Sequence, residues 1–293
     1  MNIIDSHLHI WQLSRGDYRW LTPELPVLYQ DFSLADALSV LNENDVHRSI
    51  LVQAADSMAE TEYLLEMAAS QKEHIAGVVG WIDFSSSRAV AHLQRLSENP
   101  LLIGVRPMLQ DISPVDWILQ PQFENVFDKL AVSGLVFDAL ISAEQLPVID
   151  ELAQRHPRLK IVIDHCAKPQ LDWQPGEQAS QQWYVNLKQV AECANVVIKI
   201  SGLPSESLSA FTTQPAMDYI QHVFKHFGVE RMLWGSDWPV VNQRSHYPQW
   251  LAFCMWAAEQ LGWDLQQQQL FFADNVSRIY GLSPLDKEDS ACQ

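Results

Sequence analysis

Eight short apolar runs, distributed over most of the 293 residues, constrain the fold more than any other feature of this sequence. Each run is followed by a stretch with helical periodicity, and this alternation predicts βαβ units around a parallel sheet. A chain of this length fits a single-domain α/β fold of the (β/α)8 TIM barrel type, whose usual size is about 250 residues. A doubly wound sheet is the alternative. The expected strands are 3–9, 49–53, 75–81, 101–106, 134–140, 160–165, 196–201 and 231–237.

The sequence favours one domain followed by a short tail. No linker, charge block or low-complexity segment marks a second domain, so we assign residues 1–282 to the barrel and the polar residues 283–293 to a frayed C-terminal tail. No predicted strand is followed by a glycine-rich phosphate loop, which argues against nucleotide binding. Ser33 is the predicted N-cap of a helix that begins at Leu34.

The charge of the chain excludes several classes of partner. The formal net charge is -17 and the pI is near 4.8, whereas nucleic acids and anionic membranes require a basic surface. The four cysteines are scattered without CxxC spacing, which indicates reduced thiols. No signal peptide and no apolar stretch of the roughly 20 residues that a membrane span requires are apparent. We therefore expect a cytoplasmic protein that binds neither nucleic acid nor membrane.

Most of the predicted strands end in a side chain that can take part in chemistry. In a barrel the active site lies at the carboxyl ends of the strands and in the loops after them. His7 and His9 lie two residues apart and share one face of their strand, so they can hold one metal ion or flank one substrate. The other strand ends contribute Gln53, Trp81, Asp83, Arg106, Asp138, Asp164, His165, Ser201 and Asp237.

Taken singly, the three most prominent of these residues have structural explanations. His165 alone is more often a buried histidine with satisfied hydrogen bonds than a metal ligand. Asp237, before Trp-Pro, is also typical of a residue that turns a strand into its loop, and Arg106 can be the partner in a structural ion pair. Their conjunction with the His-x-His pair favours a common site at one barrel mouth.

Strand parity makes further predictions. It places His165 on the face of Ile161 and Ile163. Asp5 and Asp164 have the opposite parity to the histidines, which predicts for both either a helix-facing structural role or a role in supporting the residues of the site. Asp138 and Lys199 fall within apolar runs, and either a buried pair or a solvent-facing edge explains them.

Aromatic residues suit a sugar-like ligand because their faces pack against the C–H surfaces of a pyranose ring. The predicted loop 11–31 is long for a compact domain, and such a loop often lies over a binding site. Core packing explains any single tryptophan as well. We expect the substrate contacts to come from Trp11, Gln53, Trp81 and Trp238, with Trp20 as a further candidate.

Several of these stretches together resemble the amidohydrolase superfamily, in particular its branch of metal-dependent (β/α)8 hydrolases that act on sugar-acid lactones. The resemblance covers most of the chain in the expected order. It is carried by residues 4–11 (IDSHLHIW), 104–107 (GVRP), 163–169 (IDHCAKP), 199–203 (KISGL), 234–239 (WGSDWP) and 275–282, which is similar to the closing helix of the family.

The resemblance implies a lactonase similar to the fuconolactonases and rhamnonolactonases, or to the lactonases of aromatic degradation. Binuclear members of the superfamily carry a bridging lysine or glutamate on strand four, where this chain has Arg106. The resemblance therefore implies one divalent ion, with zinc favoured, or none. The implied ligands are His7, His9, His165 and Asp237.

We expect a hydrolase that opens a lactone such as fucono- or rhamnonolactone, with Asp237 as the base that activates water. In a metal-free version, Arg106 and His165 would stabilise the developing oxyanion instead. A decarboxylase of the same superfamily and a non-catalytic sugar-binding protein are the alternatives. The charge argues against a third, a metal-dependent nuclease. The expected partner is a small lactone, and a homo-oligomer is left open.

Overall fold

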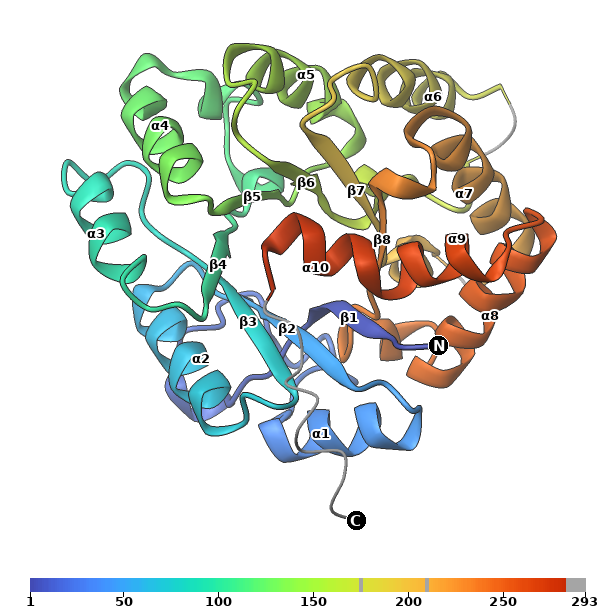
Figure 1. Cartoon of the computed structure of the whole chain (residues 1–293), viewed down its shortest axis with the longest axis horizontal. Coiled ribbons are helices and arrows are strands. Elements are labelled where there is room, and N and C mark those ends of the chain that lie inside the picture. Colours follow the sequence, from blue (N-terminus) through green and yellow to red (C-terminus); the bar gives the residue numbers. More distant parts are fainter. Residues whose placement is uncertain (174–175, 209–210, 283–293) are drawn as a thin grey trace.

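The computed structural model describes residues 1–173, 176–208 and 211–282, and within these residues eight parallel strands form a nearly closed barrel. The strands are hydrogen-bonded in chain order from β1 to β8 (Figure 1). The predicted TIM barrel is therefore confirmed, and the doubly wound sheet is wrong. The strands are β1 Ile4–Leu8, β2 Arg48–Val52, β3 Ile75–Gly80, β4 Leu102–Val105, β5 Val136–Ala139, β6 Ile161–Ile163, β7 Val196–Ile200 and β8 Met232–Trp234.

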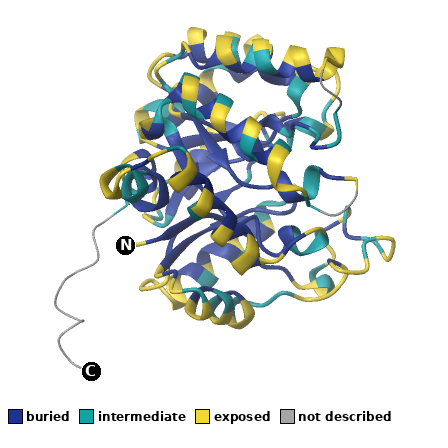
Figure 2. Ribbon diagram, turned by 90° about the vertical axis from the view of Figure 1, so that its right-hand side faces the viewer, coloured by how far each residue is buried: buried dark blue, intermediate teal, exposed yellow. Residues whose placement is uncertain are grey.

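Helices surround the barrel, with their apolar sides against the strands and their polar sides outward (Figure 2). The predicted cap of the first helix is confirmed, because the Ser33 hydroxyl accepts the N–H of Asp36 over 3.2 Å. The helices are α1 Leu34–Glu43, α2 Met58–Ser70, α3 Ala89–Leu96, α4 Glu124–Ser133, α5 Leu146–Arg155, α6 Gln178–Val190, α7 Thr213–Phe227, α8 Tyr247–Gln260, α9 Leu265–Gln269 and α10 Asn275–Tyr280.

The interior of the barrel is an apolar layer to which every strand contributes. Because both faces of a parallel strand are covered, the strands are apolar throughout instead of alternating. Helix α10 lies across one end of the barrel (Figure 1) and packs Val276, Ile279 and Tyr280 against this layer. The strand residues of the layer are Ile4, Ile50, Val52, Ala76, Val79, Ile103, Val136, Val162, Val197 and Leu233.

The first and last strands meet just beyond the end of β8. Leu8 forms a parallel bridge with Trp238, and the backbone N–H of His9 donates to the carbonyl oxygen of Trp238 over 2.8 Å. The long segment 11–31 contains a short 3-10 helix, turns and bends, and it is closed by an antiparallel bridge between Trp11 and Phe32. The predicted tail 283–293 lies outside the described residues. Among the described helices, none is both long enough and apolar enough to cross a membrane.

Candidate active site

The two N-terminal histidines lie side by side at the carboxyl end of β1. The register of β1 against β2 shifts between Asp5 and Leu8, so the residues after the shift no longer follow the alternation set by Ile4. The Nε2 atoms of His7 and His9 lie 3.2 Å apart, and His9 Nδ1 lies 2.8 Å from the carbonyl oxygen of Val52. The predicted pairing of the two imidazoles is present.

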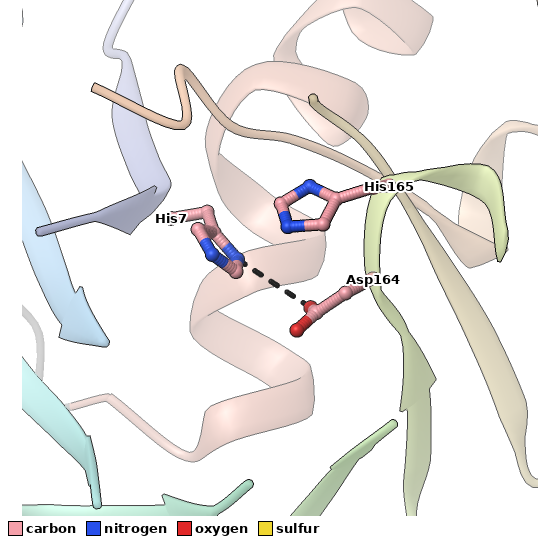
Figure 3. A group of neighbouring side chains, drawn as sticks. All are labelled: His7, Asp164 and His165. Atoms are coloured by element: carbon pink, nitrogen blue, oxygen red, sulfur yellow. Dashed lines mark ion pairs between the residues drawn. The ribbon is translucent and has the colours of Figure 1, made fainter. Parts of the chain in front are cut away.

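His165 reaches the same place by a route that strand parity does not predict. Ile161 and Ile163 pack in the layer between the strands and the helices, outside the barrel interior. The prediction that His165 shares their face is therefore wrong, because His165 points to the interior. His165 begins a run of four residues with left-handed backbone, with φ values of 52° to 58°, which is costly for residues other than glycine. Figure 3 shows the His165 ring beside that of His7, with 4.5 Å between their centroids. Its Nδ1 lies 2.9 Å from the Ser201 hydroxyl.

Asp237, after β8, lies at the centre of the three histidines. Its Oδ1 lies 3.4 Å from His9 Nε2, 3.8 Å from His7 Nε2 and 3.9 Å from His165 Nε2. Asp237 also has left-handed backbone, with φ of 58°. Among the described residues, this buried oxygen has no hydrogen-bond partner. The site therefore places a carboxylate oxygen and three ring nitrogens around a common point.

The electrostatics of the site keep the Asp237 carboxylate charged and disfavour the charged forms of His7 and His165. Burial opposes ionisation of Asp237, but His165, His9 and His7 together hold the pKa of its carboxyl well below its ordinary value. Burial lowers the pKa of His165 to about 4 and that of His7 well below its ordinary value. Neutral imidazoles beside an ionised carboxylate are the forms that bind a divalent metal ion.

Arg106 lies in the site and is held there by Gln53. The guanidinium donates through Nε to Gln53 Oε1 over 2.8 Å and through Nη2 to the Gln53 carbonyl oxygen. Its Nη1 lies 3.2 Å from Asp164 Oδ2 and 3.3 Å from His7 Nε2. Gln53 is fully buried, so in this structure it positions Arg106; direct contact of Gln53 with a substrate stays a prediction.

Asp164 faces into the site, so the helix-facing alternative is wrong for this residue, whereas the alternative of a supporting role agrees with its contact with His7. It lies two residues after Val162 of β6 and therefore on the same interior face. Its Oδ1 lies 3.4 Å from His7 Nδ1 (Figure 3). Burial opposes ionisation, but Lys199, His7 and Arg106 hold the pKa of the Asp164 carboxyl well below its ordinary value. Asp5 does have the helix-facing role, because its Oδ2 accepts from the Tyr247 hydroxyl of α8 over 3.1 Å.

Lys199 and Asp138 form a buried pair, one of the two arrangements expected from the sequence. Lys199 Nζ lies 2.5 Å from Asp138 Oδ2 and 3.1 Å from Asp164 Oδ1, and all three side chains are fully buried. Burial raises the pKa of Asp138 to about 6 despite the opposing charge of Lys199. Asp138 lies two residues after Val136, and Lys199 lies two residues after Val197; both valines face the barrel interior. Strand alternation from these valines would have predicted that Asp138 and Lys199 also face the interior.

The predicted aromatic contacts differ in their exposure. Trp11 is fully buried and donates through Nε1 to the Gln30 carbonyl oxygen over 2.8 Å, which favours packing over ligand contact. Trp238 is nearly buried and packs edge-on against Phe32. Trp81 and Trp20 are half-buried. The role of all four in substrate binding stays a prediction.

The side chains present fit a single divalent metal ion. His7, His9 and Asp237 offer three ligand atoms within 4.8 Å of one another, as do His7, Asp164 and His165. His9 and His165 each engage Nδ1 with an oxygen partner, an arrangement that orients Nε2 of a metal-ligating histidine. The buried Asp237 oxygen, which lacks a hydrogen-bond partner among the described residues, matches an acceptor that a cation would satisfy.

Comparison with known proteins agrees with this barrel. A family model described as amidohydrolase matches residues 4–282. The chain thus belongs to the amidohydrolase family, as the sequence motifs indicated.

Individual relatives match nearly the whole chain. An L-fucono-1,5-lactonase of Burkholderia ambifaria is 37% identical over 281 residues, which cover 94% of both chains. An L-fucono-1,5-lactonase of Burkholderia multivorans is 31% identical over 290 residues, which cover 95% of this chain and 96% of that one. The crystal structure of a Burkholderia multivorans amidohydrolase with bound zinc superposes with a TM-score of 0.89 and 28% identity, over 97% of this chain and 100% of that chain.

Proposed function

We propose that this protein hydrolyses the ester bond of a sugar-acid lactone. The observation that carries the proposal is the buried Asp237 carboxylate, whose Oδ1 lies within 3.9 Å of the Nε2 atoms of His7, His9 and His165. An ionised carboxylate in that position is equipped to take a proton from water. Membership in the amidohydrolase family and two L-fucono-1,5-lactonase relatives support a hydrolase that acts on a lactone.

One zinc ion would be held by His7, His9 and Asp237, with His165 beside them. When bound, zinc would supply Lewis-acid polarisation of the lactone carbonyl. The zinc-containing structure of the Burkholderia multivorans amidohydrolase supports this choice of metal.

Asp237 would carry out the proton transfers of the reaction, and Arg106 would stabilise the negative charge that develops. Asp237 accepts a proton from the attacking water and returns it to the ring oxygen as the C–O bond of the lactone breaks, so the products are one carboxylic acid and one hydroxyl group. Its low pKa keeps it ionised at neutral pH. Arg106 is a fixed cation at the mouth, and its hydrogen bonds to Gln53 orient it to stabilise negative charge on the carbonyl oxygen.

The aromatic residues suit the apolar side of a sugar ring. Trp20 is tied to the loop after β2, because its Nε1 donates to the Ala54 carbonyl oxygen over 2.6 Å. Trp81 follows β3, and Trp238 follows Asp237 directly. These positions place aromatic side chains on elements that begin or end at the site, where C–H surfaces of a lactone would pack.

The proposal is tested with a panel of aldonolactones, beginning with L-fucono-1,5-lactone, in a pH-indicator assay of acid release. The protein is assayed as purified, after chelator treatment and after addition of zinc, with the metal content quantified each time. We expect catalysed acid release from at least one lactone. No release from any lactone, together with carbon dioxide release from small carboxylic acids, would instead favour the decarboxylase alternative.

A further inference from the structure

A line of polar side chains runs through the apolar interior of the barrel, from its closing helix to the active site. The Tyr280 hydroxyl of α10 donates to Asp138, with O–O distances of 2.8 and 2.9 Å. Asp138 pairs with Lys199, whose Nζ also lies 3.3 Å from His7 Nδ1 and 3.1 Å from Asp164 Oδ1. The ammonium of Lys199 thus contacts Asp138 on the side of α10, and His7 and Asp164 on the side of the active site.

Stability does not explain why this pair is charged. Desolvation of two buried ions offsets much of their attraction, and apolar residues of similar volume often replace such pairs at no cost. Lys199 and Asp138 are surrounded by the apolar residues of the barrel interior, where a larger apolar layer would be the simpler solution. We therefore expect the charged pair to have a role in the adjacent active site.

The geometry around His7 indicates that role. Arg106 lies 3.3 Å from Nε2 of the ring and Lys199 lies 3.3 Å from Nδ1. A neutral imidazole has one acceptor nitrogen and one N–H, so it cannot accept from both cations. When Nε2 acts as the acceptor or as a ligand, Nδ1 carries the proton, so Lys199 donates to Asp138 and pairs by charge with Asp164, and does not donate to the ring. Asp164 Oδ1, which has no hydrogen-bond partner among the described residues, is then the available acceptor for Nδ1–H at 3.4 Å.

We propose that Lys199 is a positioning residue of the active site: by holding Asp164 Oδ1 against His7 Nδ1, it fixes the tautomer in which His7 Nε2 faces Asp237. The inference rests on the proposed function, since it concerns the same histidine. Interactions of this kind behind a metal ligand change metal affinity or activity by about 10–100-fold.

The test compares the wild-type protein with Lys199→Met/Asp138→Asn, which removes both charges and leaves no uncompensated ion in the core. Tyr280→Phe is the matched control, because it removes a hydrogen bond to Asp138 but leaves both charges and the contacts of Lys199 with the site. Cooperative thermal unfolding establishes that each protein is folded. If the double variant does not fold, Lys199→Gln, which keeps N–H donors but not the charge, replaces it in every measurement.

Three experiments are made: zinc affinity is measured by chelator competition, kcat and KM on a hydrolysed lactone, and the 15N shifts of the His7 ring nitrogens by NMR. For the double variant we expect zinc affinity and kcat to fall about 10–100-fold with little change in KM, and the His7 shifts to move toward the other tautomer. Tyr280→Phe should keep wild-type values.

Wild-type zinc affinity, kcat and ring shifts in the folded double variant would overturn the inference. If the wild-type protein opens no lactone, the proposed function fails, but zinc affinity still decides the role of Lys199. If the protein binds no zinc, the ring shifts decide it.

Discussion

The backbone N–H of Asp237 donates to the carbonyl oxygen of His7 over 2.8 Å. This bond joins the segment after the last strand to the first strand, so the seam that closes the barrel is also the place where the proposed base meets the histidine pair. The separation of Asp237 from His7 and His9 is consequently set by backbone hydrogen bonds. The site should therefore be well preorganised for a carboxylate and imidazoles to act together.

Asp237→Asn should lower kcat by about 10²–10⁴-fold, because the amide keeps the shape of the side chain but cannot accept a proton from water. The measurement is the rate of acid release at saturating lactone, with thermal unfolding as the check on folding. Asp83→Asn is the matched control, since Asp83 also follows a strand but its carboxylate accepts from the Ser85 N–H of its own loop. Near wild-type turnover by Asp237→Asn would show that this carboxylate is not the base.

The purified protein should bind one equivalent of zinc per chain, because Arg106 stands at the strand-four position where the binuclear members of the superfamily that this chain resembles carry a bridging lysine or glutamate. Removal of zinc by chelator should abolish lactone hydrolysis, and stoichiometric zinc should restore it. His9→Asn should weaken zinc binding, whereas His47→Asn should not, because His47 is an exposed histidine just before β2. Two equivalents of tightly bound metal in the wild-type protein would contradict this assignment.

Gly202→Ala should impair activity through His165. A Cβ atom on Gly202 would lie 2.5 Å from His165 Nδ1, and the backbone at Gly202 has φ of +68°. We expect at least a tenfold loss of kcat and a loss of about 1–3 kcal/mol in the free energy of unfolding. Gly262→Ala separates the two effects, because Gly262 has φ of +72° but no heavy atom within 4 Å of the added Cβ. Equal loss of activity in both variants would show that crowding of His165 is unimportant.

Glu60 should contribute to the free energy of unfolding a part that falls as the pH rises from about 4.5 to 7. Burial raises the pKa of this carboxyl from 4.5 to about 7 in the folded protein, although it accepts from the N–H groups of Ala54 and Ala55 and lies near Tyr18 and Arg106. The folded state then binds more protons than the unfolded state across this range, which corresponds to a change of up to about 3 kcal/mol.

Glu60→Gln, which resembles the protonated side chain, should remove this contribution. Its free energy of unfolding relative to wild type should rise between pH 5 and pH 8, as measured by urea unfolding at both values. Glu62→Gln on the exposed side of the same helix serves as the control. A difference between Glu60→Gln and wild type that does not change with pH would refute the prediction.

The order of strands and helices followed from the sequence alone, because parallel strands with both faces covered are apolar runs and amphipathic helices have their own period. His7, His9, Arg106, His165 and Asp237 were also identifiable, since each ends a predicted strand and barrel sites lie at strand ends. Amidohydrolase membership followed from the same short motifs.

The tertiary structure decided which way several of these side chains point. A register shift in β1 and left-handed backbone at His165 and Asp237 break the alternation on which parity depends. Asp164 and Lys199 proved to face the site, because residues far apart in the chain become neighbours only when the barrel closes. The sequence by itself determined the barrel and the residues at its mouth. Their distances and the buried charges behind them depend on contacts between strands, which no local pattern encodes.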